Sequence, residues 1–156
     1  MARFEPLDAT DRKILAQLQA DGRVTVTDLA TRLPLSVSRT QRRLRDLEAS
    51  GAVVAYRAEV DAEAVGLGFR AVVFVTMSRG DRETVARFEQ ELAEVPAVVS
   101  ARRLFGDPDY LLEVVTADLA AYQRVYDDQL ATLPGVQRLT STLVMKNVVA
   151  ARGLPL

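Results

Sequence analysis

The stretch Leu35-Ser-Val-Ser-Arg-Thr-Gln-Arg-Arg-Leu-Arg-Asp-Leu-Glu-Ala-Ser-Gly51 decides the fold of the first third of the chain. Ser36 or Ser38 can cap the start of a helix, because a serine hydroxyl accepts hydrogen bonds from the free N–H groups of the first turn. Gly51 can end the helix, since glycine readily takes the left-handed conformation that often follows the last turn. The stretch therefore predicts a helix that runs to about Ser50.

The expected helix has two different faces when its residues are placed about 100° apart. The face that packs on neighbouring helices carries Val37, Thr40, Gln41, Leu44 and Leu47. The outward face carries Arg39, Arg42, Arg43 and Asp46. Guanidinium groups pair with guanine O6 and N7 or grip phosphates, so this outward face suits the major groove of DNA, with Ser38 to Arg42 nearest the base edges. Asp46 would repel a phosphate, and we therefore expect it to pair with an arginine of the same helix.

Two helical patterns precede this helix, and the second of them is short. Asp8 or Thr10 can cap the first, which carries apolar residues at helical spacing and ends at Gly22. Thr27 can cap the second, which ends at Pro34. The order of helix, short helix, tight turn and basic helix is that of a helix-turn-helix. A lone arginine-rich helix is more often a solvated face, and it is the three-helix context that favours DNA binding.

The chain has room for two small domains joined by a connecting segment. Residues 52–60 alternate weakly between apolar and polar side chains, which predicts a strand that serves as a wing or linker. We therefore expect an all-α helix-turn-helix domain over residues 1–52, a strand and linker over residues 53–68, and a second domain over residues 69–156.

The second domain shows strands and helices in the order β-α-β-β-α-β. Strands are expected over residues 70–77, 98–105, 110–116 and 137–144, and helices over residues 81–94 and 118–130. The pattern of residues 88–98 returns in residues 126–136, so each half is one β-α-β unit. This order predicts a ferredoxin-like α+β fold. One apolar face of its sheet stays uncovered in a monomer, which predicts a two-fold homodimer.

The sequence Phe105-Gly-Asp-Pro-Asp-Tyr110 lies between the two middle strands. One interpretation is a plain hairpin turn, since Gly, Asp and Pro are common turn residues. The other is a site for a small zwitterion, because Asp107 and Asp109 would attract an ammonium group and Gly106 would let the backbone approach it closely. The neighbouring side chains that can hold a carboxylate are Arg102 and Arg103.

The chain contains neither histidine nor cysteine. This excludes disulfides, thiolate and imidazole metal sites and the usual serine and cysteine triads, so we expect no metal, no cofactor and no enzymatic activity. No apolar run approaches the ~20 residues that span a bilayer, and the first residues lack the apolar core of a signal peptide. We therefore expect a protein that stays in the cytoplasm.

Over nearly its whole length the chain resembles the Lrp/AsnC, or feast-famine, family of transcription regulators. In the first half the resemblance rests on the motifs LDxxDxxIL from Leu7, LSxS from Leu35, RLxxLExxG from Arg43, and YxA from Tyr56 leading into Asp61. In the second half it rests on GDxDYLL from Gly106 and LPGV from Leu133.

The resemblance implies binding to double-stranded DNA, homodimers that assemble into octamers or larger forms, and an amino-acid or similar small-molecule effector bound between subunits. The DNA contacts that it implies are Ser36, Ser38, Arg39, Arg42 and Arg43. The effector residues that we expect are Arg103 and, in the loop, Gly106, Asp107, Asp109 and Tyr110. Pro108 stands where the family commonly has an aromatic residue, so the resemblance does not identify the effector.

Two alternatives stay open. One is an architectural protein that wraps DNA with little sequence preference and needs no effector. The other is an enzyme similar to the siroheme decarboxylases, which share this two-domain architecture but rely on active-site histidines that this chain lacks.

Overall fold

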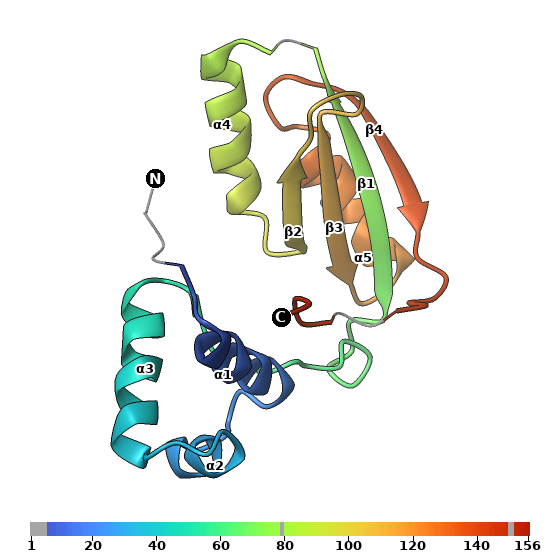
Figure 1. Cartoon of the computed structure of the whole chain (residues 1–156). Coiled ribbons are helices and arrows are strands. Elements are labelled where there is room, and N and C mark those ends of the chain that lie inside the picture. The colour runs from blue at the N-terminus through green and yellow to red at the C-terminus, as the bar shows by residue number, and fades with distance from the viewer. Residues whose placement is uncertain (1–5, 79, 150–151) are drawn as a thin grey trace. The chain divides into compact units, whose positions relative to one another are not determined.

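The structure, a computed structural model, describes residues 6–78, 80–149 and 152–156 and consists of two compact units (Figure 1). The first unit combines the chain up to Glu59 with the C-terminal segment Val149–Leu156, and the second spans Val60–Val148. The C-terminal segment, which is expected from the sequence to belong to the second domain, makes its contacts within the first unit. None of the helices in the described ranges is long and apolar enough to cross a membrane.

Three helices form most of the first unit: α1 (Ala9–Ala20), α2 (Val26–Arg32) and α3 (Val37–Ala49). Asp8 caps α1 and forms a capping box with Asp11, in which each carboxylate accepts a backbone N–H of the other residue. Ser36 caps α3, and its hydroxyl accepts the backbone N–H of Arg39 at 3.3 Å. Both caps are among those that the sequence predicts.

The start of α2 differs from the prediction. Its N-cap is Thr25 and not Thr27, because the Thr25 hydroxyl accepts the backbone N–H of Asp28 at 3.1 Å and donates to the Asp28 carboxylate at 2.7 Å. Both threonines are suited to capping, but only Thr25 is followed three residues later by an acidic residue that can return the contact. The helix therefore begins before Thr27.

The helices of the first unit pack around a small apolar core. Its buried members are Ile14, Leu15, Leu29 and Leu47. Thr40 is also fully buried, and its hydroxyl donates to the backbone oxygen of Ser36 at 3.1 Å. The predicted inward face of α3 is confirmed at Thr40 and Leu47 and is wrong at Val37 and Gln41, which are exposed.

The C-terminal segment packs against α1. The side-chain amide of Gln19 donates to the backbone oxygen of Leu154 at 3.2 Å, and its carbonyl oxygen accepts the backbone N–H of Leu154. Leu154 and Leu156 lie beside Leu18 and Val53 at the border of an apolar hollow. The end of the chain is therefore attached to the unit that carries the basic helix.

Residues 52–60 form no strand, so the predicted strand is wrong for this part of the described chain. Ala52 and Val53 still pack on the core of the first unit, and the backbone N–H of Val53 donates to Leu47 at 3.2 Å. From Val54 onward the segment is exposed. An alternating pattern becomes a strand only where a neighbouring strand supplies backbone partners, and the described residues supply none here.

The second unit contains β1 (Phe69–Met77), α4 (Arg82–Ala93), β2 (Val98–Arg103), β3 (Tyr110–Thr116), α5 (Leu119–Val125), the π-helical turn η1 (Tyr126–Leu130) and β4 (Val136–Leu143). This is the predicted β-α-β-β-α-β order. The strands form one antiparallel sheet in the order β2-β3-β1-β4 (Figure 1). Most boundaries lie within one residue of the predicted ones. The larger differences are that β2 ends at Arg103 and that the second helix changes to π geometry after Val125.

Both helices of the second unit pack on the same face of the sheet. Alternate residues of β1 and β3 point to this face and are buried against them: Ala71, Val73, Val75, Tyr110, Leu112 and Val114. Leu92 of α4 and Leu130 of η1, which occupy equivalent places in the predicted repeat, are both buried in this core. The two β-α-β halves therefore contribute to one core in the same way.

The opposite face of the sheet carries no helix of the described part of the second unit. Val72, Phe74 and Leu111 alternate with the core residues and are only partly buried. On the same face Arg70 and Glu113 form an ion pair at 2.6 Å. Within the described part of the second unit no helix packs on these residues, which agrees with the uncovered face expected from the sequence.

Candidate DNA-binding helix and effector loop

The outward side of α3 brings together most of the predicted DNA contacts. Ser38, Arg42 and Arg45 stand four and three residues apart, so they share one stripe of the helix, and all three are exposed. Arg39 is exposed as well, and the Ser36 hydroxyl lies 3.3 Å from that of Ser38. Arg45 is absent from the predicted contacts, although its spacing from Ser38 and Arg42 marks it.

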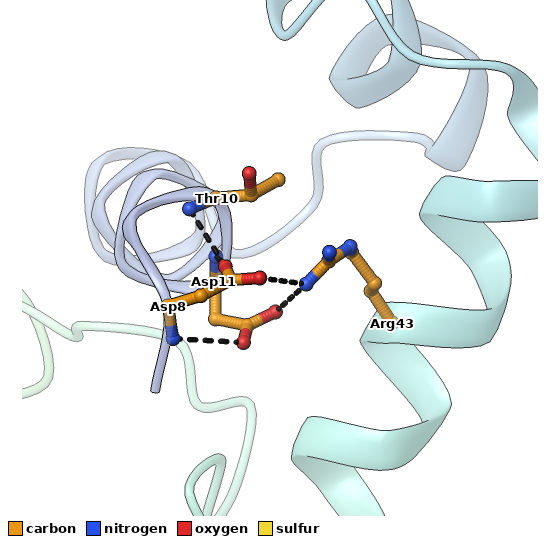
Figure 2. A network of polar contacts seen from close by, with 4 residues as sticks. All are labelled: Asp8, Thr10, Asp11 and Arg43. Carbon is orange, nitrogen blue, oxygen red and sulfur yellow. Dashed lines mark hydrogen bonds and ion pairs between the residues drawn. The ribbon is translucent and has the colours of Figure 1, made fainter. Parts of the chain in front are cut away.

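Arg43 lies on a different side of α3 and is bound by two carboxylates of the first helix (Figure 2). Its Nη1 lies 2.8 Å from Asp8 Oδ2 and 2.7 Å from Asp11 Oδ1. The predicted outward position of Arg43 is therefore wrong. The reason is its spacing, because Arg43 follows the buried Thr40 by three residues and precedes the buried Leu47 by four, which puts it at the edge of the buried stripe.

These contacts shift the pKa values of Arg43 and Asp8. Hydrogen bonds to the carboxylates of Asp11 and Asp8 raise the pKa of Arg43. The backbone N–H of Asp11 lowers the pKa of Asp8, and the guanidinium of Arg43 lowers it further. A lowered carboxyl pKa favours the folded state above the ordinary pKa of aspartate, and this contribution is lost as the pH falls through the lowered value. The ion pair between Arg43 and Asp8 is therefore charged at neutral pH.

One of the two acidic residues of α3, Asp46, has no charged partner among the described residues. Asp46 is exposed and forms no ion pair with any residue that the structure describes, so its predicted pairing with an arginine of the same helix is wrong. Arg43, one of its expected partners, is held by α1 instead. Nor do the acidic residues of the described ranges form a group of three that could hold a metal ion.

The loop between β2 and β3 holds most of the predicted effector residues, and Asp109 fastens it to β1. The backbone N–H of Asp109 donates to Val75 at 2.9 Å, and its backbone oxygen accepts the N–H of Leu104 at 2.7 Å. Its carboxylate Oδ2 accepts the backbone N–H of Met77 at 2.7 Å. Asp109 therefore shapes the loop.

Gly106 and Asp107 lie at the exposed tip of the same loop. Gly106 has a φ of 138°, a conformation that favours glycine. The Asp107 side chain is exposed, and its carboxylate has no partner among the described residues. Of the two carboxylates expected to attract an ammonium group, Asp107 is therefore the one that accepts no hydrogen bond from the described residues.

Tyr110 and Arg103 meet at Glu89 of α4, on the helix side of the sheet. The Tyr110 ring is buried against Phe88 with 4.7 Å between ring centroids, and its hydroxyl donates to Glu89 Oε1 at 2.8 Å. Burial, and then the hydrogen bond to Glu89, raise the pKa of Tyr110 to about 12. Arg103 Nη1 lies 3.7 Å from the same Glu89 oxygen. These side chains border a hollow of about 290 Å³ between α4 and β2.

Glu89 could not be predicted from the sequence as a member of this cluster. Glu89 is an exposed glutamate on a helix that carries several others, and no spacing within α4 distinguishes it. It is singled out only because the fold places it against Tyr110 and Arg103.

Two family descriptions cover almost the whole chain. The Lrp/AsnC ligand binding domain matches residues 70–154, and the winged helix-turn-helix DNA-binding domain matches residues 7–54. The Bkd operon transcriptional regulator of Pseudomonas aeruginosa is 37% identical over 150 residues, which cover 96% of this chain and 98% of that protein. The leucine-responsive regulatory protein of Haemophilus influenzae is 32% identical over 146 residues, with 94% and 88% covered.

Solved structures show the same likeness in three dimensions. A transcriptional regulator from Neisseria meningitidis in complex with L-Met has a TM-score of 0.90 and 37% identity, and the match covers 96% of this chain and 97% of that one. These relatives are transcription regulators and not enzymes, so the decarboxylase alternative is set aside. With a helix-turn-helix in its first unit and a ligand-binding domain in its second, the chain belongs to the Lrp/AsnC family of DNA-binding transcription regulators.

Proposed function

We propose that the protein binds operator DNA as a two-fold dimer, with the start of α3 in the major groove, and that an amino acid bound near the β2–β3 loop changes its affinity for DNA. The observation that carries the DNA part is the exposed stripe of Ser38, Arg42 and Arg45, with Arg39 and Ser36 beside it. The three arginines of this group have no acidic partner among the described residues. Their charges are therefore free to meet phosphates and guanine edges.

The open face of the sheet supports the dimer. Its partly exposed apolar residues, Val72, Phe74 and Leu111, would be covered by the same face of a second copy. A two-fold dimer would read half-sites about one helical turn (~10 bp) or a multiple of it apart. Further association of dimers into octamers or larger forms follows from the family resemblance, and we place the protein in the cytoplasm with its DNA target.

An amino-acid effector is supported by the L-Met bound to the neisserial relative. In this chain Asp107 offers a free carboxylate to an ammonium group, and Gly106 lets a ligand approach the backbone. Arg103 carries the guanidinium that would hold the carboxylate of the ligand. Asp109 and Tyr110 would hold the loop and the adjoining wall in place around it.

Footprinting and equilibrium titration on DNA from around its own gene test the DNA part. We expect protection of discrete paired half-sites and an affinity for them on the order of 1,000-fold above that for unrelated duplexes. Uniform protection of any duplex would instead indicate an architectural protein.

A thermal-shift screen of free amino acids, beginning with L-methionine, tests the effector part. We expect at least one of them to raise the melting temperature and to alter operator affinity, and the operator should alter the affinity for that amino acid by the same factor. A screen without any stabilising amino acid would count against effector sensing but not against the proposed binding of operator DNA.

A further inference from the structure

We propose that Arg43 is a positioning residue for DNA binding, which fixes α3 against the start of α1 and does not itself touch DNA. Asp8 and Asp11 are the residues that hold it. The inference rests on the proposed function, since it takes α3 as the helix that enters the groove.

The two carboxylates are held in place by the backbone of α1 (Figure 2). Asp8 Oδ1 accepts the backbone N–H groups of Thr10 and Asp11, both at 2.8 Å. Asp11 Oδ2 accepts the backbone N–H of Asp8 at 3.2 Å. Each aspartate therefore uses one oxygen in the capping box and presents the other to Nη1 of Arg43.

This geometry makes the contact stiffer than an ordinary surface ion pair. Surface pairs are weak partly because two mobile side chains lose conformational freedom when they meet. Here both aspartates are short and already ordered by backbone hydrogen bonds, and the Arg43 side chain is only 30% exposed. The start of α1 is therefore a fixed point that sets the rotation of α3, and with it the direction in which Arg42 and Arg45 point.

The local charge argues against a direct DNA contact by Arg43. One guanidinium lies between two carboxylates, so the cluster of Arg43, Asp8 and Asp11 has a net charge of -1, from +1 and two charges of -1. A phosphate that approached Nη1 would meet both carboxylates. The preceding residue, Arg42, is exposed and has no acidic partner among the described residues. The two adjacent arginines thus have different roles: Arg42 faces DNA, and Arg43 holds α3 against the start of α1.

The salt dependence of operator affinity tests this division with the matched variants Arg42→Gln and Arg43→Gln. Each phosphate contact contributes ~0.9 to the slope of log affinity against log salt concentration. We expect Arg43→Gln to bind about tenfold more weakly at every salt concentration, with the slope unchanged. We expect Arg42→Gln to lower the slope by about one. All titrations use full-length protein whose circular dichroism shows it to be folded.

A second pair of variants tests the same contact from the acidic side. Asp11→Asn keeps an oxygen that can accept the Asp8 N–H but removes a charge that holds Arg43. Removing a negative charge near DNA ordinarily strengthens binding, which we expect for Asp46→Asn on the exposed side of α3. We expect Asp11→Asn to weaken binding severalfold instead, and Arg43→Lys, which keeps the charge, to recover part of the affinity lost in Arg43→Gln.

Several results would overturn the inference. A slope lowered by about one in Arg43→Gln would mean that Arg43 touches a phosphate. Unchanged affinity in Arg43→Gln beside a weakened Arg42→Gln, or tighter binding by Asp11→Asn, would mean that the cluster does not position α3. If Arg43→Gln fails to fold, the operator affinities of Asp11→Asn and Arg43→Lys test the inference in its place. Unchanged binding in both Gln variants would remove α3 from the interface and so reject the proposed function as well.

Discussion

Replacing Asp109 by alanine should destabilise the second unit, whereas replacing Asp107 should leave its stability nearly unchanged. The Asp109 carboxylate accepts the backbone N–H of Met77 at 2.7 Å in a partly buried place, and its loss leaves that donor unpaired. A hydrogen bond to a charged group contributes about 1.5–3 kcal/mol, so we expect Asp109→Ala to lower the free energy of unfolding by that amount. Asp109→Asn can still accept the N–H without the charge and should lose about 1 kcal/mol.

Asp107 is the matched control, since it lies in the same loop and is exposed without a partner among the described residues. We expect Asp107→Asn to change the free energy of unfolding by less than about 0.5 kcal/mol and to weaken effector binding about tenfold. Urea denaturation measures the first quantity, and calorimetric titration with L-methionine, or with the amino acid found by the screen, measures the second. Equal destabilisation by Asp107→Asn and Asp109→Ala would refute this division of roles.

Three further predictions concern a tight glycine, the cap of α2 and a buried tyrosine. Gly135→Ala should lower the free energy of unfolding by about 2–5 kcal/mol. The residue has a φ of 75°, and a new Cβ would lie 2.4 Å from a threonine methyl group. Gly66→Ala is the control, since Gly66 has a φ of 77° and nothing lies within 4 Å of a new Cβ; it should lower the free energy of unfolding by only about 1 kcal/mol in the same urea denaturation. Thr25→Ala should lower the free energy of unfolding by about 1 kcal/mol as the true cap of α2, and an equal loss in Thr27→Ala would contradict that assignment. Because the pKa of Tyr110 is raised from 10.0 to about 12, stability should be full below pH about 10 and fall as the pH rises towards 12. Tyr110→Phe should flatten that part of the curve, and an unchanged pH profile would reject the assignment.

Features that depend on neighbours along the chain were largely predictable. The caps Asp8 and Ser36 follow from side chains that reach N–H groups two or three residues away. The order of the second unit follows from apolar residues at strand and helix spacing, and β3 has the predicted bounds. The strand predicted over residues 52–60 failed because the same alternation has no pairing partner in the described chain.

The segments that carry the candidate sites could be predicted from the sequence. Which of their charged side chains are bound within the protein could not. The β2–β3 loop and the basic helix were both found from sequence, and most of their named residues lie together. The error over Arg43 arose because its partners, Asp8 and Asp11, belong to another helix and share no local pattern with it. Glu89 was missed for the same reason, since only packing brings it to Tyr110 and Arg103.

Residue order alone was enough to predict a helix-turn-helix followed by a ferredoxin-like domain, because backbone periodicity and capping act over a few residues. The family was indicated by the resemblance of several sequence motifs, among them GDxDYLL from Gly106. Only the tertiary structure decides which of two neighbouring side chains of the same type is available for a ligand. Arg42 and Arg43 are chemically identical, as are Asp107 and Asp109. Within the described residues Arg43 is held by two carboxylates and Asp109 accepts a backbone N–H, whereas the side chains of Arg42 and Asp107 have no such partner. The physical cause is that an ion pair or hydrogen bond depends on separations of about 3 Å, which distant segments reach only when they pack.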